Sequence, residues 1–152
     1  MGSAGAAFGA PSRAGVLLLG PSGSGKSDLA LRLIAEGAVL VADDRVELFL
    51  LRSRLYARPP KRLAGLIEAR GIGIFEIPYS QKVRIALVAE LVHKLARLPE
   101  HRLFTARELN IHERAKPPLI RICPQETSAT SKVAAAVAAF EHRLFRETVK
   151  TT

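Results

Sequence analysis

Apolar residues along the chain form short continuous runs separated by segments of helical spacing. The run at 16–19 ends at a glycine-rich stretch, and the run at 38–42 ends at two aspartates. Continuous apolar runs bounded in this way predict strands that are covered on both faces. Between them, apolar residues over 29–35 suit a buried helix, and Gly37 is typical of a helix end. The order predicts an α/β fold in which helices flank a central sheet.

The second half of the chain carries weaker patterns. Residues 46–57 predict a β-hairpin, with strands at 46–51 and 55–57 joined by Arg52-Ser53-Arg54. A short strand is expected at 119–123, followed by a final helix capped by Ser128 or Ser131. The apolar spacing of residues 83–95 by itself favours an amphipathic helix.

The N-terminal segment 1–14 is rich in small residues, and we expect it to be flexible or loosely attached. It lacks the charged start and apolar core of an export signal. With 152 residues the chain is long enough for one sizeable core, so we expect a single domain over residues 15–149.

A phosphate-binding loop follows the first predicted strand. The sequence reads Gly20-Pro21-Ser22-Gly23-Ser24-Gly25-Lys26-Ser27, and it lies between a strand and a helix as such a loop requires. Glycine lets the backbone fold around a polyphosphate, so that amide groups and a helix N-terminus point at the anion. In this pattern the lysine reaches the β and γ phosphates of ATP, and the serine holds Mg²⁺.

Asp43 and Asp44 directly follow the second predicted strand. Carboxylates at that edge, beside a phosphate loop, are suited to holding a metal ion and to accepting a proton. Because adjacent side chains in an extended segment point opposite ways, we expect the two aspartates to divide these tasks. An aspartate pair that only starts a turn is the structural alternative.

Glycines alternate with branched apolar residues at 71–77. Glycine within such a run suggests a bulge, or close approach of a ligand or another backbone. Glu68 and Arg70 stand just before it, so they are either members of the site or a solvated ion pair.

The composition of the chain argues against some classes of function. The net charge is +9, yet the basic residues are scattered and aromatic residues make up only 5%, so no base-stacking platform for nucleic acid is visible. A positive surface would equally attract ATP or an acidic protein. No apolar run approaches a membrane span. The single cysteine, Cys123, excludes an internal disulfide and agrees with a cytoplasmic protein.

Three blocks in order resemble the C-terminal catalytic domain of HPr kinase/phosphorylase. They are the phosphate loop, the segment Leu40-Val-Ala-Asp-Asp-Arg-Val46 and the segment Ile67-Glu-Ala-Arg-Gly-Ile-Gly-Ile74. The resemblance covers roughly residues 15–97, in a form without the family's separate N-terminal domain. Over the first part of residues 83–95 it implies a strand, whereas the apolar spacing favours a helix, and both alternatives stay open. It implies a P-loop kinase fold with a central mixed sheet, related to that of phosphoenolpyruvate carboxykinase. It also implies an oligomeric enzyme that phosphorylates a serine of the phosphocarrier protein HPr, or of a paralogue, and can return phosphate by phosphorolysis.

The resemblance also assigns roles to single residues. Lys26 matches the family's phosphate-binding lysine, Ser27 and Glu68 match its magnesium ligands, and Asp44 matches its acid/base residue. Asp43 is a further candidate metal ligand. Arg97 falls where family members place a catalytic arginine, the alternative being an arginine at a helix end.

Two departures from the family keep other functions open. Residues 1–14 contain no counterpart of the family's histidine upstream of the first strand, and residues 124–132 replace its Gly-Arg-Asn loop. Lys132 is a possible source of positive charge there. A small-molecule P-loop kinase, or a nucleotide-binding regulatory module with little turnover, are the alternatives.

Overall fold

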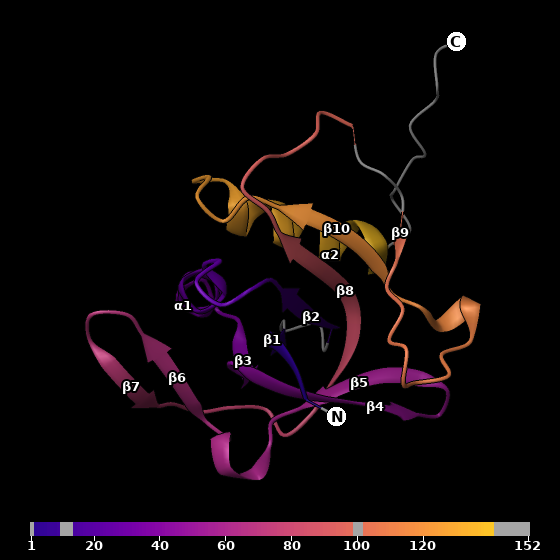
Figure 1. Cartoon of the computed structure of the whole chain (residues 1–152), viewed down its shortest axis with the longest axis horizontal. Coiled ribbons are helices and arrows are strands. Elements are labelled where there is room, and N and C mark those ends of the chain that lie inside the picture. The colour runs from indigo at the N-terminus through magenta and orange to yellow at the C-terminus, as the bar shows by residue number, and fades with distance from the viewer. Residues whose placement is uncertain (1, 10–13, 99–101, 142–152) are drawn as a thin grey trace.

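The computed structural model describes residues 2–9, 14–98 and 102–141, which form a curved mixed β-sheet with two α-helices (Figure 1). Neither of the helices in these ranges is long and apolar enough to cross a membrane. The helices are α1 (Lys26–Ala35) and α2 (Ala129–Glu141), and short 3₁₀ turns occupy Lys61–Leu63 and Glu113–Ala115. The strands are β1 (Gly2–Gly9), β2 (Ala14–Leu19), β3 (Val39–Ala42), β4 (Arg45–Leu51), β5 (Arg54–Arg58), β6 (Leu66–Ala69), β7 (Gly73–Glu76), β8 (Val83–Leu91), β9 (Arg102–Leu103) and β10 (Pro118–Ile122).

Strand β8 is the centre of the sheet. It pairs in parallel with β2 and β10, and in antiparallel fashion with β5. Strands β1 and β4 complete a closed circuit between β2 and β5, because β1 pairs with both β2 and β4, and β4 pairs with β5. The prediction of a central mixed sheet is confirmed.

The helical alternative for residues 83–95 is wrong over β8. Most of this strand is buried, because its side chains enter two separate cores, one on each face of the sheet. Leu87 belongs to the core beneath the helices, whereas Val88 belongs to the core on the opposite face. Burial on both faces removes the alternation that identifies a half-exposed strand, so the apolar spacing also fits a helix.

Part of the segment 1–14, which we expect to be flexible or loosely attached, forms strand β1, while residues 1 and 10–13 lie outside the described residues. Gly2–Gly9 pairs along one side with β2 and along the other with β3 and β4. Backbone hydrogen bonds to strands on both sides hold this segment, so it needs no apolar pattern of its own. The domain limits at 15 and 149 stay a prediction.

Both helices cover the same face of the sheet. Leu29 and Leu33 of α1 and Val133 and Val137 of α2 share one core with residues of β2 and β8. On the opposite face, β4, β5 and the segment 104–111 enclose a second core. The predicted hairpin at 46–57 and the strand and helix near the C-terminus are confirmed as β4–β5, β10 and α2.

The hairpin β6–β7 stands apart from the main sheet and projects from it (Figure 1). Gly71 and Gly73 have φ angles of 85° and 134°, and an added Cβ at either would meet no atom within 4 Å. These glycines therefore allow the turn its positive φ angles, and no other part of the described chain lies close to them.

The central position of β8 predicts a large stability loss for Leu87→Ala. Leu87 is fully buried, so truncation should lower the free energy of unfolding by about 2–5 kcal/mol. Leu98→Ala is the matched control, because Leu98 is 62% exposed and its loss should change stability by less than about 0.5 kcal/mol. Urea denaturation of both variants measures the difference, and equal midpoints would contradict it.

Candidate functional site

The glycine-rich loop between β2 and α1 forms a turn that leads directly into the N-terminus of α1. Gly23 and Gly25 have φ angles of 80° and 97°, in the left-handed region that favours glycine. Gly25 is the N-cap of α1 and provides no side-chain hydrogen bond to the first turn. The amide groups at this helix start therefore face outward without a side-chain acceptor, which suits a polyphosphate.

The interior of the loop is closely packed. A Cβ added at Gly20 would lie 2.5 Å from Ser24 Oγ, so only glycine fits there. Ser24 is buried, and its hydroxyl has no hydrogen-bond partner among the described residues. Lys26 Nζ donates to the carbonyl of Gly20. Pro21 and Ser22 lie exposed at the outer part of the loop. An unpaired buried hydroxyl and a lysine held over the loop fit an anion-binding cradle.

Asp43 connects the loop to the rest of the site. Its carboxylate is buried and accepts two hydrogen bonds, one on each oxygen. Ser27 Oγ donates at 2.8 Å, and the backbone N–H of Glu68 donates at 3.1 Å. These bonds join the start of α1, the end of β3 and strand β6. The structure therefore brings together Ser27, Asp43 and Glu68, which the sequence predicts as metal ligands.

The donors at this junction fit Mg²⁺. The described residues contain no group of three or more His, Cys, Asp or Glu side chains placed to hold a metal. Mg²⁺ at a nucleotide site needs only one or two carboxylates, because phosphates and waters complete its shell. The hydroxyl of Ser27 and the buried carboxylate of Asp43 supply hard oxygen donors of that kind, and Glu68, whose backbone N–H bonds to Asp43, is an exposed acid next to them.

Asp44 has surroundings unlike those of its neighbour Asp43. It has a φ of 66° and is exposed, while Asp43 beside it is buried. Asp44 lines a cavity of about 890 Å³ together with cationic side chains that include Arg45, Lys61 and Arg62. The two aspartates thus have different surroundings, as expected if they divide two tasks.

Arg97 is not brought into contact with the other predicted site residues. It is exposed in the segment that follows β8, and no hydrogen bond or ion pair joins it to another described residue. That segment leaves the sheet on the side of the phosphate loop, because Glu90 of β8 pairs with Leu19 of β2. Its catalytic role stays a prediction.

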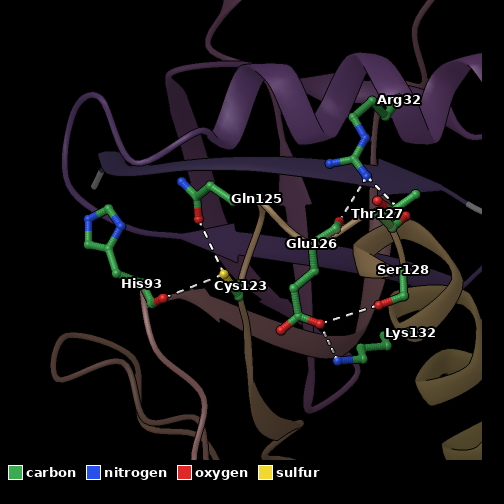
Figure 2. Close-up of polar contacts among 8 residues, drawn as sticks. All are labelled: Arg32, His93, Cys123, Gln125, Glu126, Thr127, Ser128 and Lys132. Atoms are coloured by element: carbon green, nitrogen blue, oxygen red, sulfur yellow. Dashed lines mark hydrogen bonds and ion pairs between the residues drawn. The ribbon is translucent and has the colours of Figure 1, made fainter.

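Arg32 is a residue of the site that the sequence did not indicate. From α1 its guanidinium donates to the carbonyl of Pro124 at 2.8 Å. It also donates to the carbonyls of Glu126 and Thr127 at 3.2 and 3.3 Å (Figure 2). The same loop touches the phosphate loop, since a Cβ at Gly25 would lie 3.4 Å from Pro124. No local pattern could reveal a contact between residues more than 90 positions apart.

Lys132 is engaged within this loop. Its ammonium lies 2.7 Å from the Glu126 carboxylate, which Ser128 Oγ also approaches at 3.3 Å (Figure 2). The hydrogen bond from Lys132 lowers the pKa of Glu126, aided by the Lys132 charge and by Ser128. Glu126 therefore stays ionised at neutral pH, and the pair is lost only as the pH falls through that lowered pKa. The positive charge of Lys132 is therefore paired with the Glu126 carboxylate of the same loop.

Comparisons with known proteins identify the family and the fold of the chain. The family model described as HPr Serine kinase C-terminal domain matches residues 12–151. An HPr kinase/phosphorylase of Leptothrix cholodnii is 42% identical over 104 residues, and one of Clostridium acetobutylicum is 45% identical over 64 residues. These alignments cover 59% and 42% of this chain, and 32% and 21% of the relatives. The chain therefore matches about a third or less of each relative's length.

A solved structure shares the fold. The Hpr(Ser) kinase/phosphatase from Coxiella burnetii superposes with a TM-score of 0.74, covering 95% of this chain and 97% of that one, at 24% sequence identity. At this identity the likeness concerns the fold, and it extends beyond the segments that align in sequence.

The three bonds of Arg32 predict that Arg32→Ala loosens the Pro124–Thr127 loop. We expect a loss of about 1–3 kcal/mol in the free energy of unfolding, because the carbonyls lose a charged donor. Amide hydrogen exchange over residues 125–128 should also become faster. Arg121→Ala is the control, because Arg121 makes one half-exposed ion pair with Glu90, worth at most about 1 kcal/mol. Unchanged exchange in the Arg32 variant would contradict the anchoring role.

Proposed function

Since this chain belongs to the HPr serine kinase C-terminal domain family, we propose that it transfers the γ-phosphoryl group of ATP to a serine of HPr or a paralogous phosphocarrier. The bonded set Ser27–Asp43–Glu68 beside the phosphate loop carries this proposal. It joins, at one edge of the sheet, the residue types that phosphoryl transfer from a nucleotide requires.

The loop and Lys26 would bind the triphosphate. On nucleotide binding, Lys26 Nζ would exchange the Gly20 carbonyl for phosphate oxygens, and the amide groups at the start of α1 would bind the anion. Ser27, Asp43 and Glu68 would hold Mg²⁺, which, when bound, offsets negative charge on the phosphates. Because a hydrogen bond joins Ser27 to Asp43 before the reaction, these two donors need little reorganisation as charge develops.

Asp44 would act as the base. Its exposed carboxylate would accept the proton of the substrate serine while the serine oxygen bonds to the γ-phosphorus and the bond to the leaving ADP breaks. In the phosphorylase direction, the protonated carboxyl group would return that proton. The cavity that Asp44 lines is open and carries cations, so it offers room and charge for an incoming protein loop with its serine. A cytoplasmic location and a homo-oligomeric state remain predictions.

Asp44→Asn tests the assignment directly. The variant should still bind ATP, because Asp44 has no bond to the loop, but seryl phosphate formation on purified HPr should fall by roughly 10²–10⁴-fold. Glu108→Gln is the matched control, since Glu108 is an exposed acid that does not line the cavity beside Asp44. Phosphate transfer followed by mass spectrometry, with ATP affinity measured by calorimetry, separates chemistry from binding.

The alternatives give other results. ATP binding without transfer by the wild-type chain would favour a regulatory nucleotide-binding module. Transfer to a small molecule and not to HPr would favour a small-molecule kinase. Full transfer activity in Asp44→Asn would remove Asp44 from the mechanism.

Asp43→Asn tests the metal junction. Asparagine keeps the shape and can accept the Glu68 N–H, but it removes the charge. We expect half-maximal transfer to need about 10–100-fold more Mg²⁺. Glu76→Gln is the control, because Glu76 is an exposed acid on β7. An identical Mg²⁺ dependence in the two variants would exclude Asp43 from the metal site.

A further inference from the structure

The hydroxyl of Ser24 is a buried polar group inside the phosphate loop. Ser24 is 7% exposed, and its Oγ has no hydrogen-bond partner among the described residues. A buried hydroxyl without a partner destabilises a fold, whereas alanine would fill nearly the same space without that cost. The packing of the loop as it stands therefore does not explain a serine at this position.

The Ser24 side chain lies against Gly20, where the loop begins. A Cβ built on Gly20 would lie 2.5 Å from Ser24 Oγ and 3.4 Å from Leu91 Cβ. The backbone N–H of Ser24 donates to the carbonyl of Pro21 at 3.1 Å, and this turn holds residue 24 back against residue 20. The unpaired hydroxyl is therefore next to the backbone of Gly20.

The carbonyl of Gly20 already has a donor, and that donor is the lysine of the loop. Lys26 Nζ donates to it. In the proposed function the same ammonium group turns to phosphate oxygens. The carbonyl would then lose its charged donor inside a loop that the nucleotide covers, which costs binding free energy unless another donor replaces the lysine. Ser24 Oγ is the unpaired donor beside it.

We propose that Ser24 is a positioning residue, whose hydroxyl takes over the Gly20 carbonyl when Lys26 turns to the phosphates. This inference rests on the proposed function, because it requires a polyphosphate in the loop. In the empty loop the charged lysine is the stronger donor, so it holds the carbonyl and the hydroxyl stays unpaired. In the occupied loop the phosphates accept from Lys26 and the carbonyl accepts from Ser24. The exchange therefore lowers the cost of releasing the lysine and strengthens nucleotide binding.

Urea denaturation without nucleotide tests the exchange in the empty loop. Ser24→Ala removes an unpaired hydroxyl, so it should leave the midpoint unchanged or raise it. Lys26→Met removes the ammonium group and keeps the stem, so in this background the hydroxyl should already bond to Gly20. Adding Ser24→Ala to Lys26→Met should therefore lower the midpoint by about 0.3–1 M. The same midpoint shift in both backgrounds would show that the two side chains are not coupled, and would overturn the proposal.

ATP binding and transfer kinetics test the exchange in the occupied loop. Ser24→Ala should weaken the affinity for ATP with Mg²⁺, measured by calorimetry, about 3–10-fold, because the Gly20 carbonyl is left without a donor. KM for ATP should rise by a similar factor, while kcat stays within about twofold because Ser24 touches no reacting atom. Wild-type affinity in this variant would overturn the exchange and leave the proposed function in place.

Ser53→Ala is the control, since Ser53 is exposed in the β4–β5 turn. Its ATP affinity should stay within about twofold of wild type. An equal loss of affinity in this control would contradict the proposal, because the effect would not be specific to the loop. ATP binding without transfer by the wild-type chain would remove the kinase assignment, while affinity and urea midpoint would still decide the exchange. A wild-type chain that binds no ATP would overturn both.

Discussion

The rest of the site depends on the two hydrogen bonds that the buried carboxylate of Asp43 accepts. A buried charge is costly unless its oxygens are hydrogen-bonded, and here each oxygen has its own donor, Ser27 Oγ and the N–H of Glu68. Through these bonds one side chain fixes the start of α1 relative to the end of β3 and to the hairpin β6–β7. The phosphate loop, the residues proposed to hold Mg²⁺ and the projecting hairpin are therefore positioned together.

The same junction explains how adjacent aspartates acquire different chemistry. Asp43 belongs to the interior and has both oxygens engaged, so it is suited to holding charge in place. Asp44 is exposed in a left-handed conformation that turns the chain out of β3. An exposed carboxylate beside a cavity can meet a substrate and exchange a proton with it more readily than a buried carboxylate whose oxygens already accept hydrogen bonds.

Sequence reasoning succeeded where local signals were strong. The continuous run before Asp43 and the Arg52–Ser53 turn predicted β3 and the β4–β5 hairpin, and the glycine spacing predicted the loop. It failed at β1, whose small residues carry no pattern and whose position comes from partner strands on both sides. The sequence alone did not decide between a helix and a strand for β8, because both faces of this strand are buried. The contacts of Arg32 depend on tertiary structure alone, because its partners are distant in sequence.

Strand β8 also separates two positively charged environments. At its C-terminal end, Leu91 packs against Gly20 of the phosphate loop, where backbone amides and one lysine provide the positive potential. At its N-terminal end, Arg84 belongs to a cavity whose potential comes from arginine side chains. Backbone donors are fixed by the fold and suit a substrate that must be held in one orientation. Arginine side chains can be replaced without altering the strands, so the charge at that end depends on side-chain identity, whereas the charge at the other end depends on the fold itself.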